Sequence, residues 1–148
     1  MDRKQIKQLV LNHLQEQINN IKEQINSLTT DAQNDAKSSA GDKHETGLAM
    51  MHLEQEKLNN KLSQLLQLEQ AAKQLPKEKT LNKVVLGSVV KTNHAVFYIS
   101  VPMQSFVYQN ETIVCVSAQA PLIQQMLNKE IHSEISFNNL TYKIIEIF

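Results

Sequence analysis

The sequence predicts an α+β protein in which a long antiparallel helical hairpin precedes a small antiparallel β-sheet domain with one short helix. The first half of the chain has apolar residues at heptad spacing, whereas the second half has short runs rich in Val, Ile, Phe and Tyr. Aromatic residues make up only 5% of the 148 residues, which favours a large helical element over a broad globular core. The predicted domains are a hairpin at 1–75, a linker at 76–83 and a sheet domain at 84–148.

The first predicted helix follows from an apolar seam with steps of three and four residues. Its members are Leu11, Leu14, Ile18, Ile21, Ile25 and Leu28. This is the heptad pattern of a coiled coil, and Gln, Glu, Asn and Lys fill the positions between. A single amphipathic helix on a globular core is the alternative. The seam stops at Thr29, and small polar residues from there predict a turn, with the hairpin tip at about 38–46.

A second seam predicts the returning helix. Its members are Leu48, Met51, Leu58, Leu62, Leu65 and Ala72. Two helices of similar length joined by one turn pack most simply as an antiparallel hairpin. Each would contain ~35 residues and measure ~50 Å at 1.5 Å per residue. Pro76 is expected to end the second helix because it lacks an N–H and clashes with the preceding turn.

The C-terminal half changes to the strand period. The runs "KVVLGSVVKT", "HAVFYISV" and "ETIVCVSA" predict strands, and "APLIQQMLNKE" predicts a short helix with Pro121 in its first turn. The segments "SEISF" and "LTYKIIEIF" flank Asn138 and Asn139, a pair that suits a two-residue hairpin turn. These elements predict a small sheet packed on one helix.

Composition excludes several classes of protein. The 15 basic and 15 acidic residues give no net charge, so the chain lacks the basic excess of a direct nucleic-acid binder. Cys115 is the only cysteine, is expected to be buried, and allows no internal disulfide or CxxC metal motif. The N-terminus is polar and no apolar run approaches the ~18 residues of a membrane helix. We therefore expect a soluble, cytoplasmic and monomeric protein.

The predicted tip carries two carboxylates in "GDKHET", residues 41–46. Asp42 as N-cap with Glu45 three residues later resembles a capping box, and both charges would face the positive end of the helix dipole. The other interpretation is a pair of exposed oxygens that shares a hard cation such as Mg²⁺ with a partner. Two carboxylates are too few to hold Mg²⁺ tightly alone, so the remaining ligands would come from that partner. His44 is expected to be a solvated turn residue.

Two stretches together resemble the Gre-type transcript-cleavage factors of bacterial RNA polymerase. The family's tip motif G-D-x-x-E-N is similar to "GDKHET", with Thr46 in place of the final Asn. A second family motif, a proline-started helix ending in Gly-Lys before a strand, is similar to residues 120–137, with Asn128 in place of the Gly. The resemblance covers nearly the whole chain. It implies an N-terminal antiparallel coiled coil and a C-terminal domain of FKBP-like fold.

The resemblance also implies a function. The coiled coil would enter the secondary channel of RNA polymerase, into which the RNA 3′ end of a backtracked complex is extruded. Asp42 and Glu45 would help hold a second Mg²⁺ there, shared with the polymerase and not bound by the isolated protein. The chain would then activate the polymerase's own nuclease and would not be an enzyme by itself.

Two other functions stay open. Related proteins of this architecture occupy the secondary channel as modulators or inhibitors without cleavage activity. A generic coiled-coil adaptor or an FKBP-like isomerase is the remaining alternative. For an isomerase, Phe97, Tyr98, Phe106 and Tyr108 would line a pocket, whereas alternate packing on the two faces of a sheet explains the same four aromatic residues.

Overall fold

The computed structural model describes residues 1–38 and 42–148, apart from the side chains of residues 32, 34–38 and 42–44. The described chain has an α+β layout with helices α1 (Arg3–Ser38), α2 (Asp42–Lys73) and α3 (Pro121–Met126) and a six-stranded sheet. Contacts divide it into two compact units. One unit comprises residues 12–70, and the other joins residues 1–11 to residues 71–148.

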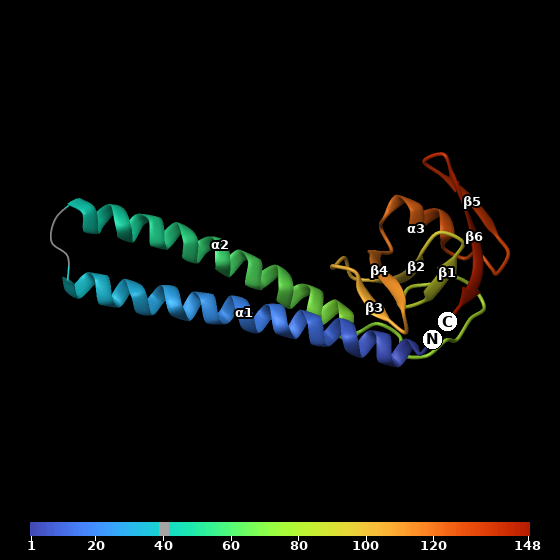
Figure 1. Cartoon of the computed structure of the whole chain (residues 1–148), viewed down its shortest axis with the longest axis horizontal. Coiled ribbons are helices and arrows are strands. Elements are labelled where there is room, and N and C mark those ends of the chain that lie inside the picture. The colour runs from blue at the N-terminus through green and yellow to red at the C-terminus, as the bar shows by residue number, and fades with distance from the viewer. Residues whose placement is uncertain (39–41) are drawn as a thin grey trace. The chain divides into compact units, whose positions relative to one another are not determined.

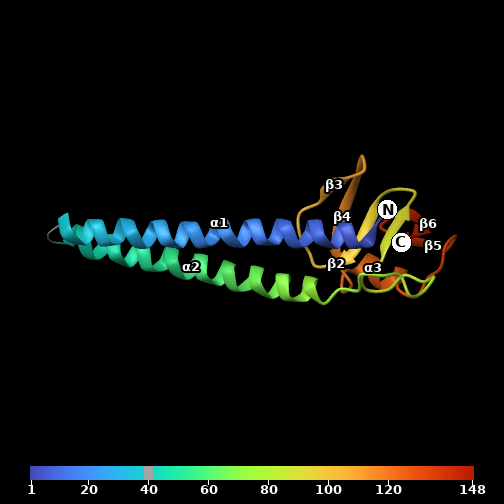
Figure 2. The ribbon, with the colours of Figure 1, turned by 90° about the horizontal axis from the view of Figure 1, so that it is seen from below.

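In the unit of residues 12–70, α1 and α2 lie side by side and run in opposite directions (Figures 1 and 2). The Gln55 amide on α2 donates a hydrogen bond to Thr29 Oγ1 on α1 over 3.1 Å. Of the predicted seam, the residues that are buried in this unit are Leu14, Ile18, Ile21, Leu58 and Leu65. The other seam residues are half-buried, including Leu11, which belongs to the other unit. Ala72 is the exception, because it is buried. The antiparallel hairpin predicted from the heptad pattern is therefore confirmed.

The helix ends follow from local chemistry. The Asp2 carboxylate accepts a hydrogen bond from the Lys4 N–H at 2.8 Å, which satisfies one of the free N–H groups at the start of α1. At the other end, the N–H of Leu75 bonds to the carbonyl of Ala72 at 3.2 Å, three residues back, so the last turn tightens. Pro76 follows at once, as expected for a residue that cannot continue a helix.

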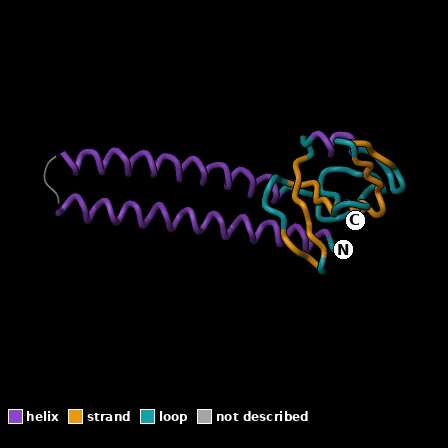
Figure 3. Tube along the Cα trace, turned by 45° about the horizontal axis from the view of Figure 1, so that its top comes forward, coloured by secondary structure: helices purple, strands orange, loops and turns teal. Residues whose placement is uncertain are grey.

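The sheet has the strand order β3-β4-β2-β1-β6-β5. Its strands are orange in Figure 3. The strands are β1 (Val89–Thr92), β2 (Val96–Ser100), β3 (Phe106–Tyr108), β4 (Glu111–Ser117), β5 (Glu134–Phe137) and β6 (Leu140–Ile147). Four neighbouring pairs are antiparallel, whereas β2 and β4 are parallel, with Tyr98 opposite Cys115. The predicted antiparallel sheet therefore contains one parallel pair.

The parallel pair arises from the short strand β3, which the sequence analysis did not predict. After β2 the chain reverses into β3 at the sheet edge, then reverses again into β4, which inserts between β3 and β2. Two reversals restore the original direction, so β4 must run parallel to β2. Gln109 and Asn110 form the second reversal with φ of 52° and 65°, as a two-residue type I′ turn requires.

The other predicted elements of the sheet domain are present, but the run predicted as a strand at 83–92 is a strand only at 89–92. The FKBP-like fold stays a prediction. Asn138 and Asn139 join β5 to β6 with φ of 50° and 63°, again the pattern of a type I′ turn. Pro121 is the first residue of α3, which packs on the sheet through Ile123 and Met126. Together with residues of the sheet and its loops, these two side chains form one core, which comprises Val84, Val90, Phe97, Ile99, Ile123, Met126, Ile135, Ile144 and Ile147.

The charged segment predicted as a linker at 76–83 is tied to the sheet domain. Lys79 Nζ donates to the carbonyl of Ile147 at 2.7 Å, and Lys83 pairs with Glu130 at 3.8 Å. Pro76 packs on Gly87, where a Cβ would come within 2.9 Å of the proline ring and where φ is +87°. Residue 87 must therefore be glycine on two counts, space and backbone conformation. The predicted domain boundaries at 75 and 84 stay a prediction.

Tyr98 is fully buried, and its hydroxyl has no hydrogen-bond partner among the described residues. Burial raises the pKa of this phenol to about 12. A buried polar group without a partner costs about 1–3 kcal/mol of stability. We therefore expect Tyr98→Phe to increase the free energy of unfolding by about 1 kcal/mol, measured by urea denaturation with unchanged slope.

A matched control is Tyr108→Phe. The Tyr108 hydroxyl donates to Gln5 Oε1 at 2.7 Å, so its removal is expected to lower stability slightly. A clear loss of stability in Tyr98→Phe would contradict the prediction and would indicate that an ordered water satisfies the Tyr98 hydroxyl.

Candidate functional site

The candidate site lies where α2 begins. Asp42 is the first residue of α2, and Glu45 falls in the same first turn. Residues three apart on a helix are neighbours on its surface, so positions 42 and 45 share one face. The side chains of Asp42 and His44 lie outside the described residues, as do residues 39–41. The capping hydrogen bond expected for Asp42 and the solvated position expected for His44 therefore stay predictions.

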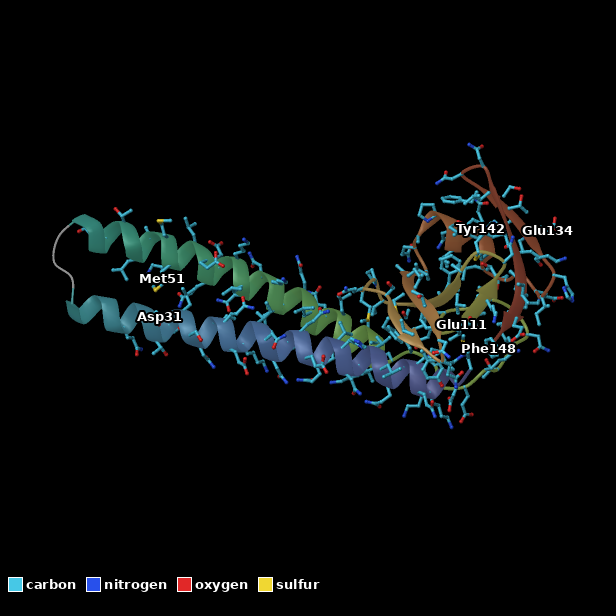
Figure 4. The ribbon with its side chains drawn as sticks, viewed as in Figure 1. Asp31, Met51, Glu111, Glu134, Tyr142 and Phe148 are labelled. Atoms are coloured by element: carbon cyan, nitrogen blue, oxygen red, sulfur yellow. The ribbon has the colours of Figure 1, made fainter. Side chains whose placement is uncertain are left out.

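Glu45 is exposed, so its two oxygens can reach a ligand without displacing protein atoms. The same face continues one turn later at Ala49 and another turn later at Leu53, which is 67% exposed. On the opposite side, Met51 points toward α1 and is half-buried (Figure 4). Met50 is 67% exposed, so of the two methionines only Met51 takes part in the packing between the helices.

Gly47 stands in α2 immediately after the acidic turn. A Cβ at this position would meet nothing within 4 Å, so packing within the chain does not require glycine here. Glycine within a helix costs about 1 kcal/mol relative to alanine. The result is a stretch of bare backbone beside Glu45 that another molecule can approach closely.

Carboxylate oxygens are suitable ligands for Mg²⁺, which keeps several waters and is commonly held by one or two carboxylates plus the phosphates of a substrate. An exposed Glu45 with a second acidic position three residues earlier fits such a shared site. Within the part of the chain that the structure describes, no group of three or more His, Cys, Asp or Glu side chains is placed to hold a metal ion. Any complete coordination sphere built on Glu45 would therefore include ligands beyond these side chains.

The other residues considered from the sequence fall into packing roles. Phe97, Tyr98 and Phe106 are buried, and Tyr108 is half-buried. The alternation expected from the sequence does not hold for β2, because this strand is buried on both of its faces. Cys115 is buried as predicted, and this burial raises the pKa of its thiol to about 11. A thiol protonated at neutral pH is a poor nucleophile.

Of the lysines in the sheet domain, Lys83 and Lys91 have acidic partners. Lys91 Nζ lies 2.5 Å from Glu111 Oε1 across the sheet. A different group of lysines, which the sequence analysis did not single out, lines a pocket between the start of α1 and the end of α2. These are Lys4, Lys7, Lys73 and Lys77.

A signal for this group was present in the sequence. An antiparallel hairpin brings together residues equally far along the chain from its turn. Lys4 and Lys77 are nearly equidistant from residues 40 and 41, and so are Lys7 and Lys73. Applying the predicted hairpin to charged residues as well as to the apolar seam would have placed the four side chains together.

No model of a known protein family matches the chain, and no curated protein matches it. Among the described residues, no helix is both long and apolar enough to cross a membrane.

Proposed function

We propose that this protein binds the secondary channel of bacterial RNA polymerase and stimulates cleavage of backtracked RNA through Asp42 and Glu45. The observation that carries the proposal is an exposed glutamate in the first turn of α2, three residues after Asp42, where a long antiparallel hairpin reverses. A slender helix pair is a suitable shape for a narrow channel. Acidic residues at its turn are suitable for the polymerase active site at the channel's inner end.

Two features of the sheet domain support the resemblance on which this function rests. A short helix begins with Pro121, at the place where the Gre-type motif has a proline. The family's glycine falls on Asn128, which has φ of 65°. This left-handed conformation favours glycine and is tolerated by asparagine, so a glycine in the motif would suit the backbone that Asn128 has here.

The chain's own contribution to the reaction is to present negative charge. Asp42 and Glu45 would offer oxygen ligands to a Mg²⁺ ion shared with aspartates of the polymerase. A second metal ion stabilises the charge that develops on the attacking and leaving oxygens of a phosphodiester. The bare backbone at Gly47 leaves room beside Glu45 for RNA or for the channel wall. The polymerase supplies the rest of the active site, so the protein acts as a cytoplasmic activator without being an enzyme itself.

A reconstituted backtracked elongation complex tests this function. The complex is built with the polymerase of the same organism, the RNA is labelled at its 3′ end, and Mg²⁺ and the native protein are added. We expect rapid release of a short labelled fragment that the polymerase alone releases slowly. If the native protein shows neither cleavage nor binding, the proposal is overturned. The acidic turn would then be only a helix cap.

A second function, channel binding without cleavage, is favoured by one observation. Thr46 stands where the family motif has asparagine, so the immediate surroundings of the carboxylates differ from the motif. In the same assay, a modulator would release no fragment but would compete with a known secondary-channel binder. Competition without cleavage would therefore select this second function.

A further inference from the structure

Four lysines converge on one pocket within the unit that joins residues 1–11 to residues 71–148. Lys4 and Lys7 come from the first turns of α1, Lys73 is the last residue of α2, and Lys77 follows Pro76. Together with Gln8 and Leu11 they line a cavity of about 320 Å³. We call it the lysine pocket. It is about ten times the ~30 Å³ that one water occupies in the liquid.

Lys7 is fixed at the base of the lysine pocket. Its side chain is only 4% exposed, and its ammonium donates to the carbonyls of Lys73 and Leu75, each at 2.6 Å. These carbonyls belong to the end of α2, where helix geometry leaves C=O groups without an N–H partner and the helix dipole favours a cation. An ammonium has three N–H donors, so Lys7 keeps one for a ligand.

The charges of Lys4 and Lys77 in the lysine pocket are poorly neutralised. Lys4 pairs with Glu78 at 3.0 Å, but both side chains are more than half exposed, and such a pair contributes little. For Lys77, the described part of the chain provides no ion pair. Burial lowers the pKa of Lys7, and the neighbouring charge of Lys77 lowers it further. These like charges repel one another, and a bound anion would relieve that repulsion.

We propose that the lysine pocket binds a compact anion made of linked phosphate groups. Lysine ammonium groups act as point charges for phosphate, whereas planar carboxylates are matched best by the forked guanidinium of arginine. The cavity is large enough for two or three linked phosphates but too small for a folded acidic segment. Leu11 is the one apolar lining residue, and no aromatic ring lines the pocket to stack on a base. The recognised chemistry is therefore the phosphate chain itself.

The test is calorimetric titration of the full chain with inorganic pyrophosphate in the absence of Mg²⁺. We expect saturable binding by the native protein and at least about tenfold weaker binding by Lys77→Gln, because a hydrogen bond to a charged group is lost. Lys77 is exposed and lies outside the helices, so this variant is expected to fold, which circular dichroism verifies. The matched control is Lys61→Gln, another exposed lysine, on α2 away from the lysine pocket, with unchanged affinity expected.

Two further titrations separate the sources of the phosphate chain. Orthophosphate is expected to bind at least about tenfold more weakly than pyrophosphate, because it offers fewer charges to the lysine pocket. ATP is expected to match inorganic tripolyphosphate, which has the same number of linked phosphates, if the phosphates alone are recognised. Binding of ATP that is tighter than that of tripolyphosphate would assign a nucleotide as the source.

Absence of saturable binding by the native protein, or equal weakening in Lys77→Gln and Lys61→Gln, would overturn the proposal. Orthophosphate binding as tightly as pyrophosphate would overturn the linked-phosphate class. The titrations contain no polymerase, so their outcome is independent of the cleavage function proposed above.

Discussion

The double variant Asp42→Asn/Glu45→Gln is expected to slow transcript cleavage by at least about 100-fold while leaving binding to polymerase nearly unchanged. Stabilisation of developing charge by a metal ion contributes several kcal/mol, and each 1.36 kcal/mol changes a rate tenfold. Neutral amides keep the shape of the two side chains but lose the charge that, under the proposed function, would draw Mg²⁺ to the tip. The measurement is the rate of release of the 3′-labelled fragment as Mg²⁺ concentration is increased. Saturation with metal is expected to need more Mg²⁺ in each single variant.

Two controls accompany this variant. Asp31→Asn on α1 and Glu54→Gln on α2 each remove an exposed carboxylate of the hairpin without touching the acidic turn. Both are expected to cleave within about twofold of the native rate, since exposed charges more than a Debye length of ~8–10 Å apart are largely screened. A native cleavage rate in the double variant would exclude the carboxylates from the reaction. If its melting temperature fell at the same time, stabilisation of the helix dipole by the two charges would be their role, because asparagine and glutamine still cap a helix.

The second large effect is expected at Arg3, a buried cation that ties the start of α1 to the sheet domain. Its guanidinium donates to the carbonyl of Phe148 through Nε, at 3.1 Å, and through Nη2. It also donates to the carbonyl of Glu78 at 2.9 Å and lies 3.5 Å from Ser88 Oγ. Burial lowers the pKa of this guanidinium, and these hydrogen bonds offset its loss of hydration.

Arg3→Met keeps much of the side-chain volume but leaves these acceptors without their donor. We expect the free energy of unfolding to fall by about 3 kcal/mol, because a buried polar group left unpaired costs about 1–3 kcal/mol. For a chain of this length that corresponds to a decrease of roughly 6–12 °C in melting temperature. Urea denaturation and a thermal melt both measure it.

Lys4→Met is the matched control for Arg3→Met. Lys4 is the next residue of the same helix turn, is more than half exposed and pairs with an exposed Glu78. Its replacement is expected to change stability by less than about 0.5 kcal/mol. A similarly small effect of Arg3→Met would contradict the assigned role and would indicate that water replaces the guanidinium at the Phe148 carbonyl.

The position of the candidate site could be predicted from the sequence, but the exposure and the surroundings of its residues could not. The heptad seams place the turn between the two helices, so Asp42 and Glu45 could be assigned to the hairpin reversal from spacing alone. That Glu45 is exposed and that Gly47 has open space around it depend on how the two helices face each other. The lysine pocket depends on the same pairing, because Lys4 and Lys77 are far apart in the sequence.

By itself, the sequence determined the elements whose causes are local. Heptad stepping specified two helices and their buried faces, Pro76 and Pro121 specified where helices end and begin, and the Asn138-Asn139 pair specified a tight turn. Each depends on backbone preferences and on the period of nearby apolar residues.

Only the tertiary structure decided the features that join distant residues. The parallel pairing of β2 with β4 follows from the order in which the strands enter the sheet. The spacing of apolar residues along the sequence does not specify that order. The buried contacts of Arg3 and Lys7 arise because carbonyls at the end of α2, at Glu78 and at Phe148 meet the first turns of α1 and need donors there. In the sequence, Arg3 and Lys7 are two of several charged residues in a polar N-terminal segment. Only these hydrogen bonds show that Arg3 holds α1 to the sheet domain and that Lys7 forms the base of the lysine pocket.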